Sequence, residues 1–157
     1  MKWVLALSLI AGPVLAQDRN YDGFHACVWS VADPTDQTVY HHCTAPLVSH
    51  CGVAKTAKDA VACIEAERDA LQDQVTAEAA EFSRMETLPP NFPEAGVDVA
   101  MDELSLSNDT GAAACILMSD RDEKAGVAVG QRAVNSAFCQ LMAAGDVYGL
   151  LTQFKRP

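Results

Sequence analysis

The sequence predicts a small all-α domain stabilised by disulfides, with an irregular Cys- and His-rich N-terminal segment. Three observations lead to this fold class. Residues 57–86 are rich in Ala and Glu and contain neither Gly nor Pro, residues 110–154 show a second helical pattern, and six cysteines are spread along the chain. Helical periodicity with an even number of cysteines is typical of a small exported helical protein.

Residues 1–16 have the order of features of a secretory signal peptide. A basic start is followed by an apolar run from Trp3 to Ile10, a Gly12-Pro13 break and a small-residue cleavage site. A membrane anchor would need about 20 apolar residues, and the Gly-Pro pair interrupts the run before that length. We therefore expect cleavage between Ala16 and Gln17, and a periplasmic or secreted protein without a membrane span.

Residues 17–157 have the length of a single domain with a real core. The whole chain carries 11 Lys and Arg against 21 Asp and Glu, a net charge of −10. Without Lys2 the count is 10 against 21, a net charge of −11. Such a surface repels nucleic acid and anionic lipid and favours a cationic partner. The same excess of acid also keeps an exported protein soluble, so both interpretations stay open.

Residues 17–54 form the segment that we expect to be irregular. It is rich in Asp, Thr, Pro, His and Cys, and Asp33-Pro34-Thr35-Asp36 is a turn signal. Four of the six cysteines lie between Cys27 and Cys63. We expect this segment to depend on disulfides for its order.

A long helix is predicted over residues 57–86. Thr56 and Asp59 have the spacing of a capping box at its start. Acidic residues occupy the outer faces of the helix, at Glu65, Asp69, Asp73, Glu78 and Glu81. Residues at helical spacing form one apolar stripe, made of Ile64, Leu71, Val75, Ala79 and Phe82. The helix should therefore pack on one side only.

Residues 89–108 are predicted to be a connecting loop. Three prolines, at 89, 90 and 93, end the long helix. Beyond them Val97, Val99 and Met101 alternate, which permits a short extended piece. A loop of roughly 20 residues is long for a compact domain, so it either lies against the body or carries a contact surface.

The C-terminal region, residues 110–154, is predicted to contain more than one helix. Gly126 and Gly130 weaken a continuous helix, so a break is expected between residues 119 and 130. The piece after the break should end at Gly145, a residue suited to a helix C-terminus. A last short helix is expected over residues 146–154.

The cysteines indicate disulfides, because an oxidising compartment converts an even set of thiols into pairs. The six are Cys27, Cys43, Cys51, Cys63, Cys115 and Cys139. Cys115 and Cys139 would be about 36 Å apart on one unbroken helix, whereas a disulfide needs Cα atoms within about 7 Å. A turn at Gly126 and Gly130 would bring them together, and we favour this pair. The other four cysteines then pair among themselves.

The histidines offer a metal-binding alternative. Each lies within two positions of a cysteine, and the four are His25, His41, His42 and His50. Imidazole and thiolate are ligands that zinc and copper prefer. The chain has no Cys-x-x-Cys pair, and cysteines in disulfides do not bind metal as thiolates. We therefore expect exposed histidines on a disulfide-bonded loop and no cofactor, with metal binding as the alternative.

Motifs for catalysis are missing from the sequence. Histidines occur only in the N-terminal segment, and no Gly-x-Ser-x-Gly nucleophile elbow is present. The pair Gly126 and Gly130 lacks the Lys-Ser or Lys-Thr of a phosphate-binding loop. A solvated helix face is also a poor place to raise the pKa of a catalytic carboxyl group. We expect a protein that is not an enzyme.

Two stretches resemble the LprI-like family of periplasmic lysozyme inhibitors. The first is Cys63-Ile-Glu-Ala-Glu-Arg-Asp-Ala-Leu-Gln-Asp73, and the second runs from Cys115 through Gly126 and Gly130 to Cys139-Gln-Leu-Met. The resemblance implies an envelope protein that binds and blocks a cationic muramidase. No residue of this chain matches a functional position of the family, so no site residue follows from it. The expected function is that of an exported inhibitor of a cationic protein such as lysozyme, and a structural envelope protein is the further alternative.

Overall fold

The computed structural model describes residues 21–31, 42–82, 84–85 and 97–155. They form five α-helices and short 3-10 turns, with no β-strand among them. The elements are α1 (Tyr21–Ser30), α2 (Ala45–Val48), the 3-10 helix η2 (Ser49–Val53), α3 (Ala57–Phe82), α4 (Val97–Lys124) and α5 (Val129–Lys155). The all-α prediction is confirmed, and the predicted signal peptide lies outside the described residues. No helix in the described part of the chain is long and apolar enough to cross a membrane.

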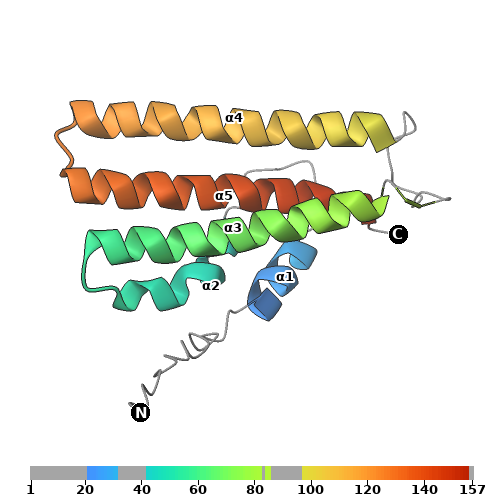
Figure 1. The fold of residues 1–157 in the computed structure, drawn as a ribbon, viewed down its shortest axis with the longest axis horizontal. Helices are drawn as coiled ribbons and strands as arrows, with labels where there is room; N and C mark the ends of the chain where they lie inside the picture. Colours follow the sequence, from blue (N-terminus) through green and yellow to red (C-terminus); the bar gives the residue numbers. More distant parts are fainter. Residues whose placement is uncertain (1–20, 32–41, 83, 86–96, 156–157) are drawn as a thin grey trace, which may run out of the picture.

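Helix α5 lies at the centre of the fold. It packs against both α3 and α4, whereas α3 and α4 make no extensive contact with each other in the described chain. Figure 1 shows the three long helices side by side, with α1 and α2 lying against α3 and α5. The molecule is therefore a layer of three long helices that is covered on one side by the short ones.

The buried side chains form two clusters along this layer. The first joins α1, α2, α3 and α5, and its largest members are Phe24, Leu47, Leu71 and Leu141. The second joins α3, α4 and α5, and includes Phe82, Leu104, Leu151 and Phe154. Burying such a side chain stabilises the fold by about 1.5–3 kcal/mol. Both clusters contain residues of α3 and α5, so these two helices carry most of the core.

Helix α3 begins where the capping signal predicts. The backbone N–H of Asp59 donates to Oγ1 of Thr56 over 3.1 Å, and the Thr56 hydroxyl donates to the Asp59 carboxylate over 2.8 Å. The predicted apolar stripe faces the core. The helix ends at Phe82 and not at residue 86, because the N–H groups of Arg84 and Met85 bond to carbonyls three residues back, which closes the helix with turns.

The predicted loop over residues 89–108 is wrong from Val97 onward, where α4 begins. The helix also starts thirteen residues before Thr110, the first residue of the predicted C-terminal helical region. Leu104 explains why these residues are helical and not a loop. Its buried side chain packs in the second cluster, and this packing stabilises the helix. Met101, Leu104 and Asn108 follow the helical spacing of three and four residues, which the alternation around Val99 obscured.

The predicted break between residues 119 and 130 is confirmed at the turn between α4 and α5. Gly126 has a positive φ of 75°. The N–H of Gly126 bonds to the carbonyl of Glu123, and the N–H of Val127 bonds to the carbonyl of Asp122. This is the Schellman arrangement, in which glycine takes the left-handed position that ends a helix. The chain therefore reverses here and lays α5 along α4.

Helix α5 continues through Gly145, so the predicted helix end there and the separate helix over residues 146–154 are wrong. Gly145 lies in a buried run of residues that contributes to both clusters. A glycine inside a helix costs about 1 kcal/mol, and the packing of the large neighbours Tyr148 and Leu151 outweighs that cost. Tertiary burial thus decides the length of this helix.

The N-terminal segment 17–54 is only partly irregular. Residues 21–30 form α1 and residues 45–53 are helical, which corrects the prediction of an irregular segment for these residues. Phe24, Val28 and Leu47 are fully buried against the long helices. Apolar contacts in the first cluster therefore give these short helices order in addition to the disulfides.

All six cysteines are paired, as their even number predicts. The disulfides are Cys27–Cys43, Cys51–Cys63 and Cys115–Cys139. The favoured pair is thus confirmed, and it joins α4 to α5. The other two join α1 to the residues before α2, and η2 to α3. Every disulfide connects different elements, so each limits how far they can separate in the unfolded chain.

Candidate partner-binding groove and the His50–Glu67 cluster

A groove of about 570 Å³ lies between α3 and α4, with α5 as its floor. Its apolar lining comes from Val75 and Ala79 on α3, Met101 and Leu104 on α4, and Ala144 and Val147 on α5. Polar groups also line it, at Gln72, Thr76, Ser105 and Asn108. A concave apolar surface with a few polar groups is the usual form of a binding site.

The groove exists because α3 and α4 each pack on α5 and not on each other. On the α4 side the separation is set by Gly111, where an added Cβ would lie 2.6 Å from Cβ of Ala143. The disulfide Cys115–Cys139 holds the same two helices together one turn further on. Small side chains such as Thr76 and Ala80 face the gap and do not fill it.

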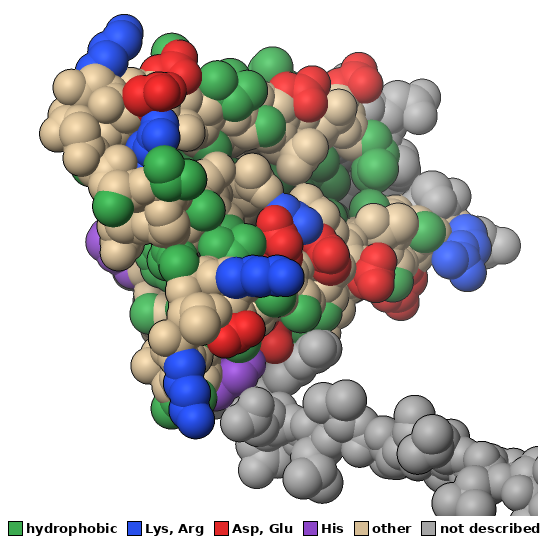
Figure 2. All heavy atoms as spheres, turned by 60° about the vertical axis from the view of Figure 1, so that its left-hand side comes forward, with side chains coloured by type: hydrophobic (Ala, Val, Ile, Leu, Met, Phe, Trp, Pro, Cys, Tyr) green, Lys and Arg blue, Asp and Glu red, His purple; other side chains and the backbone are tan. Residues whose placement is uncertain are grey.

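Both helices that flank the groove carry acidic residues and no cations over its length. Residues 69–82 of α3 contain Asp69, Asp73, Glu78 and Glu81, and residues 101–119 of α4 contain Asp102 and Asp109 among the side chains that the structure describes. Neither stretch contains Lys or Arg. On the face seen in Figure 2, acidic, basic and hydrophobic side chains lie among one another.

Ion pairs within the molecule neutralise only part of this charge. The Lys155 ammonium lies 2.7 Å from Glu78, and the Arg68 guanidinium lies 2.6 Å from Asp69. In the part of the chain that the structure describes, Asp73, Asp102 and Asp109 take part in no ion pair. These carboxylates are exposed, so the groove lies in a region of net negative potential.

Helix α4 also exposes large apolar side chains. The exposed fractions are 68% for Leu106, 65% for Ile116 and 69% for Leu117, and Met101 in the groove itself is 39% exposed. Single exposed apolar residues are common on proteins. Of these four, Met101 lines the groove, whereas Leu106 lines a separate hollow between α4 and α5.

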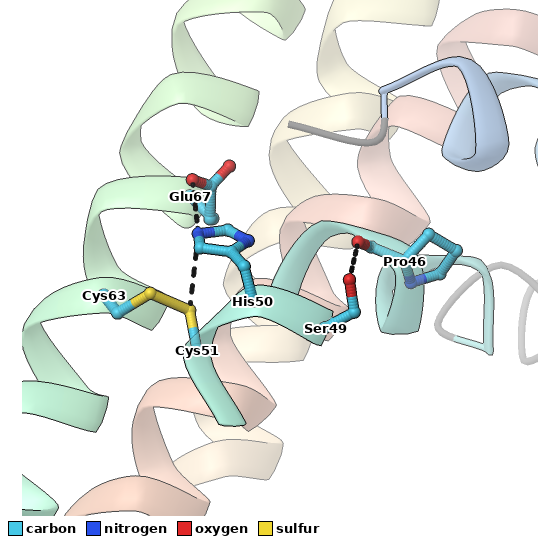
Figure 3. Close-up of a disulfide and its surroundings, with 6 residues drawn as sticks. All are labelled: Pro46, Ser49, His50, Cys51, Cys63 and Glu67. Atoms are coloured by element: carbon cyan, nitrogen blue, oxygen red, sulfur yellow. Dashed lines mark hydrogen bonds and ion pairs between the residues drawn. A yellow bond between two sulfur atoms is a disulfide. The ribbon is translucent and has the colours of Figure 1, made fainter. Parts of the chain in front are cut away.

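A second cluster lies where η2 meets α3 (Figure 3). The ring of His50 points toward the carboxylate of Glu67, with 3.5 Å between Nε2 and Oε1. The same nitrogen lies 3.8 Å from Sγ of Cys51, which is bonded to Cys63. The Glu67 side chain is only 3% exposed. A buried carboxylate is costly unless it is paired, so His50 stabilises Glu67 and ties η2 to α3.

The predicted metal ligands are placed in different surroundings. His25 stacks on Tyr148, with ring centroids 5.4 Å apart and planes inclined by 3°. His42 is exposed, and His41 lies outside the described residues. Within the described ranges, the one group of three potential donors consists of His50, Cys51 and Cys63, whose donor atoms all lie within 4.8 Å. The metal hypothesis built on all four histidines stays a prediction.

Glu67 is the residue that sequence reasoning missed. It follows Ile64 by three positions and precedes Leu71 by four, so it lies on the apolar stripe of α3. A carboxylate on such a stripe is the signal that could have found it, because buried glutamates are rare without a partner. The partner, His50, comes from a different element.

Tyr148, a member of the first cluster, makes a polar contact with α3. Its hydroxyl donates to the Glu78 carboxylate over 3.4 Å, and Lys155 binds the other oxygen of Glu78. Burial, followed by the charge of Glu78, raises the pKa of Tyr148 from 10.0 to about 12. The Lys155 ammonium also lies 5.6 Å from the ring centroid of Phe82. This network fixes the C-terminal end of α5 on α3.

No protein-family model, no curated protein and no solved structure matches this chain. The resemblance to the LprI-like family therefore stays a prediction that rests on the two cysteine-containing stretches.

Proposed function

We propose that this protein is an exported binding protein that captures and inhibits a cationic protein partner, for which lysozyme is the example that the sequence resemblance implies. The observation that carries the proposal is the apolar groove between α3 and α4, with its exposed carboxylates on both sides. An apolar surface supplies affinity, and surrounding charge selects the partner.

The partner segment that suits this groove is apolar on one side and basic on its flanks. An amphipathic helix of that kind would place its apolar side chains against Val75, Leu104 and Val147. Its Lys and Arg residues would then lie near Asp73, Asp102 and Asp109. Opposite charges accelerate the encounter and screening by salt weakens it.

The export that the sequence predicts suits the same proposal. Residues 1–16 have the features of a signal peptide, and three disulfides suit an oxidising compartment. Secreted muramidases are basic proteins that an acidic envelope protein can meet there. Inhibition by capture needs no catalytic group on this chain.

The experiment measures lysozyme activity on bacterial cell walls with increasing amounts of the disulfide-bonded protein, at low and at moderate salt. We expect inhibition at micromolar protein that weakens as salt is added. A second arm measures the binding of a basic amphipathic helical peptide by calorimetry. Binding of the peptide without inhibition of lysozyme would reject lysozyme as the partner, and the absence of both would overturn the proposal.

A pair of variants locates the contact. Thr76→Arg places a cation in the groove on an exposed position of α3, and it should weaken binding at least about tenfold because burial of the apolar segment is lost and the charge is repelled. Ala66→Arg makes the same charge change on an exposed position of α3 outside the groove. This control should retain most of the affinity. Equal effects of the two would show that net charge alone matters.

A further inference from the structure

We propose that Cys51, Cys63, His50 and Glu67 form a zinc-type metal site when the Cys51–Cys63 disulfide is reduced. The inference is independent of the groove, because it rests on the other end of α3. It differs from the metal hypothesis drawn from the sequence, since it keeps only His50 of the four histidines. In the oxidised protein the two sulfurs are bonded to each other and are not available as thiolate ligands, so the site does not bind metal.

The spacing of the donor atoms carries the proposal. Nε2 of His50 lies 3.5 Å from Oε1 of Glu67 and 3.8 Å from Sγ of Cys51. In a tetrahedral zinc site, bonds of about 2.0–2.3 Å place neighbouring donor atoms about 3.3–3.8 Å apart. The His50 nitrogen therefore has such a separation both from the Glu67 oxygen and from the Cys51 sulfur (Figure 3). The donor atoms of His50, Cys51 and Cys63 all lie within 4.8 Å of one another, and the Glu67 carboxylate has to turn toward the sulfurs to complete the set.

The two cysteine sulfurs have to move apart before both can bind one metal ion. They are 2.02 Å apart in the disulfide, and they would stand about 3.8 Å apart as two zinc ligands. The Cα atoms are 5.7 Å apart, so side-chain rotation alone supplies this separation. Cys63 and Glu67 lie one turn apart on the same face of α3, and His50 and Cys51 are neighbours in η2. Two pairs of donors thus converge from two elements.

The burial of Glu67 is a second observation that favours a ligand site. Its side chain is 3% exposed, while His50 is 21% exposed and forms the outer side of the cluster. A buried carboxylate beside an imidazole and two thiolates forms an oxygen, nitrogen and sulfur set that suits zinc. Cys63 is partly exposed and Cys51 is buried, so we expect a reductant to attack the disulfide from the side of Cys63.

The chemistry balances with a dithiol as the reductant. A thiolate of the dithiol attacks Sγ of Cys63, the Cys51–Cys63 bond breaks, and the second thiol of the reductant releases Cys63 as the reductant closes its own disulfide. Two electrons and two protons pass to the protein sulfurs. A divalent cation then displaces the two thiol protons to solvent and forms two thiolate bonds. His50 binds through its neutral nitrogen and Glu67 as a carboxylate.

The test uses cobalt(II) as a spectroscopic substitute for zinc in the full protein, before and after reduction with a phosphine. We expect one cobalt ion for each reduced chain, with thiolate-to-metal charge-transfer bands that zinc abolishes, and no such bands in the oxidised protein. His50→Ala and Glu67→Gln should each weaken binding about tenfold or more. Circular dichroism in the same samples should show that the helices persist.

The control is Cys115→Ser/Cys139→Ser, which removes a different disulfide and should keep the cobalt bands. Cys51→Ser/Cys63→Ser should abolish them. Bands that persist in that variant, or that are indifferent to both His50→Ala and Glu67→Gln, would mean that loose thiols bind the metal, and would overturn the proposal. Loss of the helices on reduction even with metal present would overturn it as well.

Discussion

Gly111 on α4 lies directly against Ala143 on α5, where a Cβ on the glycine would approach Cβ of the alanine to 2.6 Å. That separation is shorter than two carbon atoms can tolerate, so a side chain at position 111 pushes the helices apart. The close approach sets the distance between α4 and α5 at this point. The width of the groove between α3 and α4 depends on that distance.

Gly111→Val should destabilise the protein by about 1–3 kcal/mol, the usual cost of overpacking. Gly111→Ala should cost less, because the gain of about 1 kcal/mol in helix propensity offsets part of the clash. Urea denaturation followed by circular dichroism measures both. Gly52→Ala is the matched control, since an added Cβ there meets nothing within 4 Å. A Gly111→Val protein as stable as the wild type would contradict the contact.

The Thr56 cap makes a separate contribution to α3. Thr56→Ala removes the oxygen that accepts the N–H of Asp59, and we expect a loss of about 1 kcal/mol in the free energy of unfolding. Thr56→Ser keeps the hydroxyl and should stay within a few tenths of a kcal/mol of the wild type. The same denaturation experiment compares the two variants, and similar losses for both would argue against the cap.

The raised pKa of Tyr148 gives the stability a dependence on alkaline pH. The folded value of about 12 lies above the ordinary 10.0, so the unfolded chain releases its phenolic proton first. The contribution of Tyr148 is complete below pH 10.0 and is lost as the pH rises toward about 12. Tyr148→Phe has no proton to release. Its urea midpoint should therefore fall less than that of the wild type between about pH 8 and about pH 11.

Removal of the Cys115–Cys139 disulfide should destabilise the protein by about 3 kcal/mol, because it closes a loop with a sequence separation of 24 residues. The fold should nevertheless form, since Leu104 and Leu151 remain buried in the second cluster. Thermal unfolding of Cys115→Ser/Cys139→Ser checks the loss. A variant without helical circular dichroism would show that α4 depends on the disulfide for its existence.

The sequence predicted the elements whose signals are local. The capping pair Thr56 and Asp59, the stripe on α3 and the reversal near Gly126 each follow from neighbouring residues, and the structure confirms them. The Cys115–Cys139 pair followed from a distance limit and that reversal. Such features need no knowledge of what lies across the core.

The sequence analysis failed where a distant element decides the outcome. Residues 97–108 are helical because Leu104 is buried against α5, and α5 runs through Gly145 because its neighbours pack against α3 and α4. The groove depends on three helices at once, and the His50–Glu67 contact joins residues seventeen positions apart. Local patterns do not contain these relationships.

The central place of α5 determines the order in which the chain can fold. Helices α3 and α4 are synthesised before α5, yet each finds its main packing surface on α5. Until Leu141, Leu150 and Leu151 have been added, α3 and α4 lack the helix on which both of them pack. A chain built in this order therefore completes its core only when α5 has been made.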